Sequence, residues 1–260
     1  MRRTEKEETL PELISHYLSE VTSRLEQLAA EAEAGALDPA VDLLVEAIDA
    51  GGVIQAFGTG HSEAFAMDIA GRAGGLIPTN KVALRDVVLH GSRDAGTLKG
   101  SSMERDPSVV DELFELSPIG ANDVFIIASN SGVNGSIVGL ALLAKSRGHK
   151  VIAVTSLKHT AAVDPKHPSG RRLSEIADVV IDNKAPYGDT TLELSGGGGV
   201  GAVSSITAAF IAQLLTIGAA ERIRAAGKTP PIYISANIPG GDEHNKALED
   251  LYKNRIRRDA

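Results

Sequence analysis

The 260-residue sequence contains no cysteine and no tryptophan, and aromatic residues make up only 3% of it. The lack of cysteine excludes disulfides, thiolate metal ligands and a cysteine nucleophile. No uninterrupted apolar run approaches the roughly 18 residues that suggest a membrane span. The N-terminal segment MRRTEKEETLPEL has two arginines without a following apolar region, so no signal peptide is expected and the protein is predicted to be cytoplasmic.

The net charge of −8 disfavours a nucleic-acid-binding surface. His159 and His167 share one loop but have no third ligand at a regular spacing, so no metal site is predicted. The segment GTGHSE breaks the dinucleotide-binding pattern G-x-G-x-x-G at its third glycine, and SGGGGVGA lacks the Gly-Lys-Ser/Thr of a P-loop. The sequence therefore predicts no cofactor.

Residues 8–34 place apolar side chains at spacings of three and four, which predicts a long amphipathic helix. A second helix is expected from residue 38, with Asp38 as its N-cap and Pro39 in its first turn. Neither helix carries residues typical of a catalytic site. We interpret residues 1–50 as a helical extension that packs on the core or on a partner subunit.

From residue 51 onwards, short apolar segments alternate with segments of helical periodicity. Strands are expected within residues 52–57, 76–84, 123–129, 150–156 and 176–183. Runs of Val, Ile and Ala are typical of parallel strands that are buried on both faces. The sequence therefore predicts an α/β fold with a doubly wound, flavodoxin-like, five-stranded parallel sheet flanked by helices. Residues 51–260, including a C-terminal helix and tail, would form one domain with the N-terminal helices.

Two of the expected strands end in stretches of small polar residues. The first loop, residues 58–63, reads GTGHSE, and the second loop, residues 129–136, reads SNSGVNGS. Ligands of parallel sheets bind beyond the carboxyl ends of the strands, and a helix N-terminus favours an anion. We interpret the second loop as a lysine-free cradle for a phosphate. Its proposed ligands are Ser129, Asn130, Ser131, Gly132, Asn134 and Ser136.

The segment SNSGVN followed by SIVGLALLAKSRGHKVIAVTS resembles the phosphate-binding signature of the SIS (sugar isomerase) domain family, and GTGHS resembles the family's first substrate loop. The segments HPSGRRLSEIADVVID and ISANIPGGDEHN resemble the UPF0309-type subgroup. The resemblance implies a sugar-phosphate ligand that contacts Ser62 and the second loop. It also implies a homodimer or homotetramer with sites near the subunit interfaces.

Two positions depart from the family pattern. Asn134 stands where many members have Ser or Thr. Heptose-phosphate isomerases of the family have a catalytic Glu about ten residues beyond the Ser of the first loop, where this sequence offers Gly71 and Arg72. The resemblance therefore implies that a sugar phosphate binds. The base that moves the proton must be a residue at another position of the sequence.

The first loop supplies His61 and Glu63 as the nearest acid–base candidates, although Glu63 also suits the first turn of a helix. Glu243 and His244 lie in a Gly-Gly segment that would be either a flexible lid over the site or the start of the last helix. Glu104 and Arg105 belong to an irregular segment that could line the cleft, where the arginine could pair with a phosphate.

Two further features are left open by the sequence. Asp189 would either face the site or only form a turn. The basic loop at residues 158–172 would either steer an anionic substrate or remain a solvated loop.

The leading hypothesis is a sugar-phosphate isomerase of the aldose–ketose type that uses a carboxylate or histidine base. The alternatives are a phosphosugar lyase, like the etherases that cleave lactate from a muramic acid phosphate, and a non-catalytic phosphosugar sensor that regulates a protein partner.

Overall fold

The computed structural model describes residues 8–258, and a parallel sheet lies at its centre. The strands are β1 (Ile54–Gly58), β2 (Thr79–Val82), β3 (Val124–Ala128), β4 (Lys150–Thr155) and β5 (Val179–Asp182). Their order is β2-β1-β3-β4-β5, and all neighbours are parallel. This confirms the predicted doubly wound, five-stranded α/β fold.

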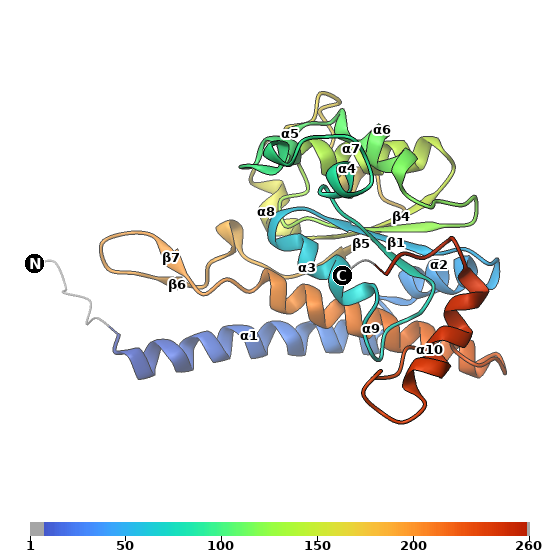
Figure 1. Ribbon diagram of the computed structural model, residues 1–260. Helices are drawn as coiled ribbons and strands as arrows, with labels where there is room; N and C mark the ends of the chain where they lie inside the picture. Colours follow the sequence, from blue (N-terminus) through green and yellow to red (C-terminus); the bar gives the residue numbers. More distant parts are fainter. Residues whose placement is uncertain (1–7, 259–260) are drawn as a thin grey trace, which may run out of the picture.

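Helices cover both faces of the sheet (Figure 1). Below the sheet lie α1 (Leu10–Glu33), α2 (Asp38–Asp49), α3 (Glu63–Ile69) and α9 (Ser204–Ala225). Above the sheet lie α4 (Asp86–Leu89), α5 (Ser102–Arg105), α6 (Val109–Leu116) and α7 (Gly135–Ser146). Alternate strand residues face the two layers, since Ile126 packs with the lower helices while Phe125 and Ile127 pack with the upper ones.

One helix boundary differs from the expected one. Asp38 is the first residue of α2, and the N-cap is Leu37. The helix α3 ends at Ile69, shortly before a glycine-rich segment. Gly71 and Gly74 adopt positive φ angles of 77° and 80°, so the chain already turns there.

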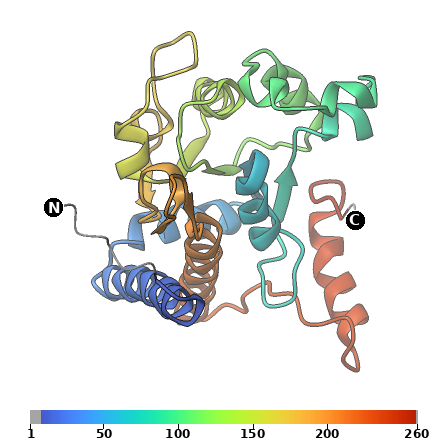
Figure 2. The ribbon, with the colours of Figure 1, turned by 90° about the vertical axis from the view of Figure 1, so that its left-hand side faces the viewer.

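The apolar helix α9 lies on the lower side of the sheet and contacts α1, α2 and α3 (Figures 1 and 2). By length and composition it passes the test for a membrane-spanning helix, with a mean hydropathy of 1.3. Core helices of globular proteins pass the same test. The contacts of α9 with its neighbours account for its apolar sequence.

A short hairpin and two smaller helices complete the described chain. They are α8 (Leu157–Ala161), the antiparallel pair β6 (Leu192–Glu193) and β7 (Gly199–Val200), and α10 (Gly241–Glu249). Gly196, Gly197 and Gly198 form the turn of this hairpin, all with positive φ angles. Beside it, Tyr17 of α1 donates a hydrogen bond to the carbonyl of Ala202 (2.7 Å), which ties the hairpin to the N-terminal helix.

Asp123 is the centre of a buried hydrogen-bond network just before β3. Its fully buried carboxylate accepts hydrogen bonds from the backbone N–H of Val53 (2.8 Å), the side chain of Gln55 (2.8 Å) and the backbone N–H of Gly120 (2.9 Å). Arg255 adds a charged donor at 2.5 Å. The network joins the entries of β1 and β3 to the C-terminal region.

The residues after α10 cover the edge strand β2. The amide of Asn80 donates to the carbonyl of Arg255 and its oxygen accepts from the backbone N–H of Arg257, both at 2.7 Å. The guanidinium of Arg258 donates to the carbonyl of Thr79 at 2.9 Å. Polar groups of the sheet edge are therefore paired with the chain's own C-terminal residues.

Candidate functional site

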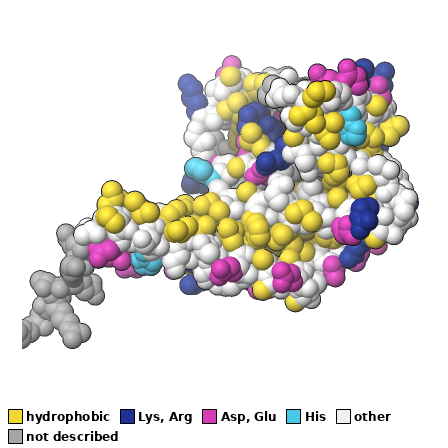
Figure 3. Space-filling view, turned by 90° about the horizontal axis from the view of Figure 1, so that it is seen from below, with side chains coloured by type: hydrophobic (Ala, Val, Ile, Leu, Met, Phe, Trp, Pro, Cys, Tyr) yellow, Lys and Arg dark blue, Asp and Glu magenta, His cyan; other side chains and the backbone are white. Residues whose placement is uncertain are grey.

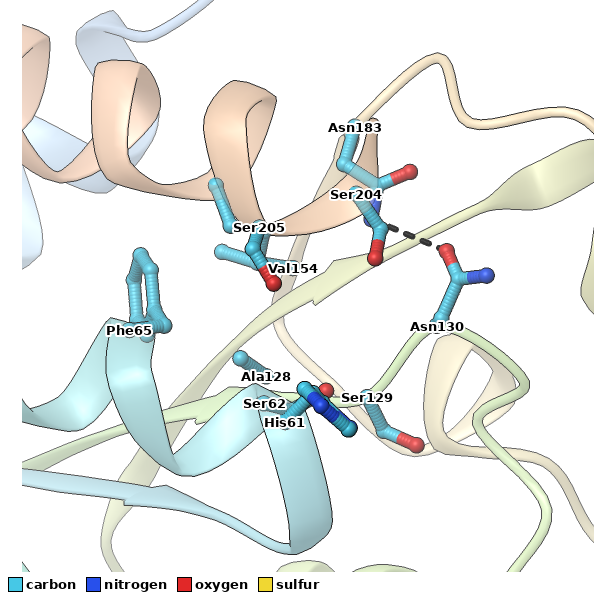
Figure 4. A pocket seen from close by; sticks show the side chains of 11 residues that line it. His61, Ser62, Phe65, Ala128, Ser129, Asn130, Val154, Asn183, Ser204 and Ser205 are labelled. Atoms are coloured by element: carbon cyan, nitrogen blue, oxygen red, sulfur yellow. Dashed lines mark hydrogen bonds between the residues drawn. The ribbon is translucent and has the colours of Figure 1, made fainter. Parts of the chain in front are cut away.

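The carboxyl ends of β1, β3, β4 and β5 meet the N-terminus of α9 at a small cavity (Figure 4). The cavity is lined by His61, Ser62, Phe65, Ala128, Ser129, Asn130, Val154, Asn183, Ser204, Ser205 and Ala208. Figure 4 shows His61 and Ser62 of the first loop next to Ser129 of the second loop. Its volume is about 10 Å³, room for one water molecule, so a larger ligand enters only when surrounding side chains move.

The second loop is shaped by its own hydrogen bonds. The hydroxyl of Ser129 accepts the backbone N–H of Gly132 (3.1 Å), and Gly132 has a φ of 64°. A side chain at Gly132 would come within 3.1 Å of the Thr155 hydroxyl, so glycine is needed for both conformation and space. The amide oxygen of Asn130 accepts a hydrogen bond from Asn183 of β5's end (3.1 Å).

The predicted phosphate ligands fall into two groups. Ser136 is fully buried and donates to the carbonyl of Glu104 (2.9 Å), so it holds the loop and does not face a ligand. Ser131 and Asn134 are half-buried, and neither side chain has a hydrogen-bond partner within residues 8–258. Asn134 is also the N-cap residue of α7, beside the unpaired N–H groups of that helix. These two side chains are free to bind an anion.

The first loop turns sharply from β1 into α3. Gly58 has no room for a side chain, because a Cβ there would overlap the carbonyl of Ser62. The turn places His61 and Ser62 in the wall of the cavity, and their contacts with a ligand stay a prediction. Glu63 faces elsewhere: its carboxylate forms ion pairs with Arg85 and, at 3.8 Å, with Lys81.

A different carboxylate approaches the first loop. Glu104 lies on α5, and its Oε1 would be 3.3 Å from a Cβ built on Gly60, next to His61. A Cβ at Gly135, the first residue of α7, would overlap the carbonyl of Arg105. Because Gly135 has no side chain, α5 packs directly on the second loop. Glu104 is therefore close to the first loop, although it is not among the residues that line the cavity.

The start of α9 forms the third wall of the cavity, which sequence reasoning missed. Asp189 accepts the backbone N–H of Ser204 (2.9 Å) and the hydroxyl of Ser204 (2.5 Å), and thereby caps the helix. Ser204, Ser205 and Asn183 line the cavity. In the sequence, these residues are recognisable only as two serines at the start of the long apolar helix and an asparagine after the last strand of the sheet. Asp189 thus forms a cap at the edge of the site.

The basic loop at residues 158–172 is attached to the second loop. The backbone N–H of Lys166 donates to the carbonyl of Val133 (3.2 Å), and that of Leu173 donates to the carbonyl of Gly132 (2.9 Å). The ring of His159 stacks on Tyr187, and burial lowers the pKa of this histidine. The basic loop therefore supports the second loop through backbone hydrogen bonds.

Glu243 and His244 are not brought to the cavity. They lie in the first turns of α10, which is a helix rather than the flexible lid that the sequence left open. His244 Nε2 is 3.0 Å from the carbonyl of Ile232, and Ile232 pairs with Leu76, which precedes β2. This places His244 near the amino ends of the strands, opposite the cavity. The Gly240 turn, with a φ of 80°, starts the helix there.

Comparison with known proteins decides the family. The sequence model of the SIS domain matches residues 16–156. The chain belongs to the SIS domain family. The UPF0309 protein lmo0025 of Listeria monocytogenes is 39% identical over 238 residues, covering 91% of this chain and 94% of that protein. Both resemblances that the sequence motifs indicated are therefore confirmed.

Two solved structures share the fold of this chain. A phosphoheptose isomerase from Francisella tularensis has a TM-score of 0.54 at 17% identity, covering 82% of this chain and 98% of that one. The protein c3406 of E. coli CFT073, in complex with a sugar phosphate, has a TM-score of 0.50 at 17% identity, covering 86% and 94%. Membership of the SIS family supports phosphosugar binding, and the reaction stays a prediction.

Proposed function

We propose that this SIS protein binds a sugar phosphate and interconverts its aldose and ketose forms. The observation that carries the proposal is the second loop, where the side chains of Ser131 and Asn134 have no protein partner within the described residues and lie at the start of α7. Free backbone N–H groups and the positive end of the helix dipole favour a phosphate there. The similarity to a phosphoheptose isomerase and to a protein with a bound sugar phosphate supports this assignment.

His61 and Glu104 are our candidates for moving the proton. Isomerisation requires a base that transfers a proton between two adjacent carbons, and a second group that assists ring opening. Glu104 approaches the first loop from α5, and His61 lines the cavity from the first loop itself. Glu63 is held by two cations outside the cavity, and His244 lies at the opposite end of the sheet.

The proposed function predicts proton exchange. Incubation of the full chain with a panel of aldose and ketose phosphates in heavy water should incorporate deuterium next to the carbonyl of one of them, as followed by NMR. The double variant Ser129→Ala/Ser131→Ala should weaken binding of that sugar phosphate by more than about 1 kcal/mol, the scale of a lost hydrogen bond to a charged group.

Ser146→Ala is the matched control, since this exposed serine at the end of α7 bonds only the carbonyl of Leu143. Binding without exchange or breakdown would favour the phosphosugar sensor. Loss of a substituent without isomerisation would favour the lyase. An unchanged affinity in the double variant would contradict the phosphate site itself.

We also propose that α1 associates with a second copy of the chain. Leu10, Ile14 and Leu18 are 69%, 59% and 64% exposed and follow each other at a spacing of four, so they form one apolar stripe. Figure 3 shows hydrophobic side chains along this projecting helix, and Ile217 of α9 is also exposed. Apolar surfaces of this kind mark interaction sites.

The expected result is a homodimer or homotetramer that Ile14→Asp/Leu18→Asp converts into a monomer, because two carboxylates would be desolvated at the interface. The mass is measured by light scattering after size exclusion. Ser15→Asp/Ser19→Asp, one position along the same helix, adds the same charge and should leave the oligomer intact. A monomeric wild-type chain would contradict the proposal.

A further inference from the structure

A second, larger cavity lies on the other side of α3 from the sugar-phosphate site. Its volume is about 440 Å³, within the range of cavities that hold small molecules. It is bounded by α3, β2, α4 and the C-terminal residues Arg257 and Arg258. Met67 and Leu89 supply apolar walls, while none of the residues that line the first cavity takes part.

The charged side chains of this cavity are mostly cationic. They are Arg72, Lys81, Arg85, Arg257 and Arg258, with Asp86 as the single carboxylate in the lining. Arg72, which follows α3, pairs with Asp68 of that helix. Arg258 donates to carbonyls of the sheet edge and lies 3.6 Å from the carboxylate of Glu249. Lys81, Arg85 and Arg257 are the other three cations of the lining.

Two carboxylates, Glu63 and Asp86, interact with these three cations. The Glu63 carboxylate forms ion pairs with both Arg85 and Lys81. The Lys81 Nζ lies 3.8 Å from the Glu63 Oε1. Asp86 is buried, accepts the backbone N–H of Ala83 (2.9 Å) and interacts electrostatically with Arg257. Counted over residues 8–258, the lining of this cavity therefore carries more positive than negative side chains, next to a volume large enough for a ligand.

We propose that this cavity binds a small molecule with two phosphate groups, which replaces the carboxylate of Glu63 between Lys81 and Arg85. Arginine and lysine are the residues that bind phosphate groups most strongly. A bound phosphate would accept charge-assisted hydrogen bonds from both Lys81 and Arg85, which now share the single carboxylate of Glu63. The apolar surfaces of Met67 and Leu89 leave space for an organic portion of the ligand.

The site is separate from the sugar-phosphate cavity and does not depend on the proposed isomerase function. The two are nevertheless adjacent in the chain, since Glu63 directly follows Ser62, which lines the first cavity. Release of Glu63 from its two cations would therefore act on the start of α3, the helix that both cavities share.

Inorganic pyrophosphate is the probe, and its affinity for the full chain is measured by calorimetry at constant ionic strength. Lys81→Gln/Arg85→Gln should weaken binding by about tenfold or more, because two charge-assisted contacts are lost. Arg224→Gln is the matched control, since this arginine is exposed on α9 and, among the described residues, pairs only with Glu221. It should bind pyrophosphate as the wild type does.

Glu63→Gln provides the second measurement, which stays informative if the double variant does not fold. Removal of the competing carboxylate should raise the affinity for pyrophosphate. The proposal is overturned by a wild-type chain that does not bind pyrophosphate, by equal affinities in Lys81→Gln/Arg85→Gln and Arg224→Gln, or by an unchanged or lower affinity in Glu63→Gln. It is equally overturned if Ser129→Ala/Ser131→Ala abolishes binding, because the probe would then occupy the second loop.

Discussion

Replacement of Glu104 by glutamine is expected to lower kcat for sugar-phosphate isomerisation by about 100-fold or more, the usual contribution of a general base. Glutamine keeps the shape of the side chain and removes only its ability to take a proton. KM should change little, because the proposed phosphate ligands lie on the second loop and not on α5. The measurement is the rate of conversion of the sugar phosphate that shows exchange in heavy water.

The control for this result is Glu115→Gln on α6, an exposed carboxylate on a neighbouring helix. It should retain wild-type kcat. A Glu104→Gln enzyme with kcat within about twofold of wild type would remove Glu104 from the mechanism. His61→Ala would then become the decisive variant, since His61 lines the cavity.

Asp123→Ala is expected to lower the free energy of unfolding by about 3 kcal/mol or more. The substitution leaves the N–H groups of Val53 and Gly120 and the amide of Gln55 without their buried acceptor. Each unsatisfied buried donor costs about 1–3 kcal/mol. Arg255 also loses its anchor, so the C-terminal residues should detach from the sheet edge more easily.

Chemical denaturation followed by circular dichroism measures this loss. Glu115→Ala removes an exposed carboxylate and should leave the free energy of unfolding unchanged within about 0.5 kcal/mol. If Asp123→Ala proved as stable as Glu115→Ala, the network around Asp123 would contribute nothing to the fold. Arg255→Gln should lie between the two, because only one of the four partners of Asp123 is altered.

The fold was predictable because its signals are local. The strands β3 and β4 are short runs rich in Val, Ile and Ala, and β3 is followed by small residues that the turn requires, as at Gly132 with its φ of 64°. The position of the second loop follows from the same logic, since the end of β3 and the start of α7 are consecutive in sequence. Binding residues on such a loop are therefore recognisable without a structure.

The chemistry was less predictable because it depends on contacts between distant residues. Glu63 was a natural candidate for the base, yet Arg85 draws its carboxylate away from the cavity. Glu104 lies close to the first loop because Gly60 and Gly135 leave room for α5. The choice between Asp189 as a site residue and as a turn residue depended on where α9 begins. No periodicity or motif encodes these pairings.

The cover of β2 by the C-terminal residues has a consequence for synthesis of the chain on the ribosome. Asn80 is translated 175 residues before Arg255, the residue whose carbonyl it binds. At cellular translation rates this separation amounts to roughly 10 to 35 s. During that interval the edge of β2 has no native cover and is open to pairing with other chains. The nascent protein therefore completes its sheet edge only when nearly all of the described chain has been made.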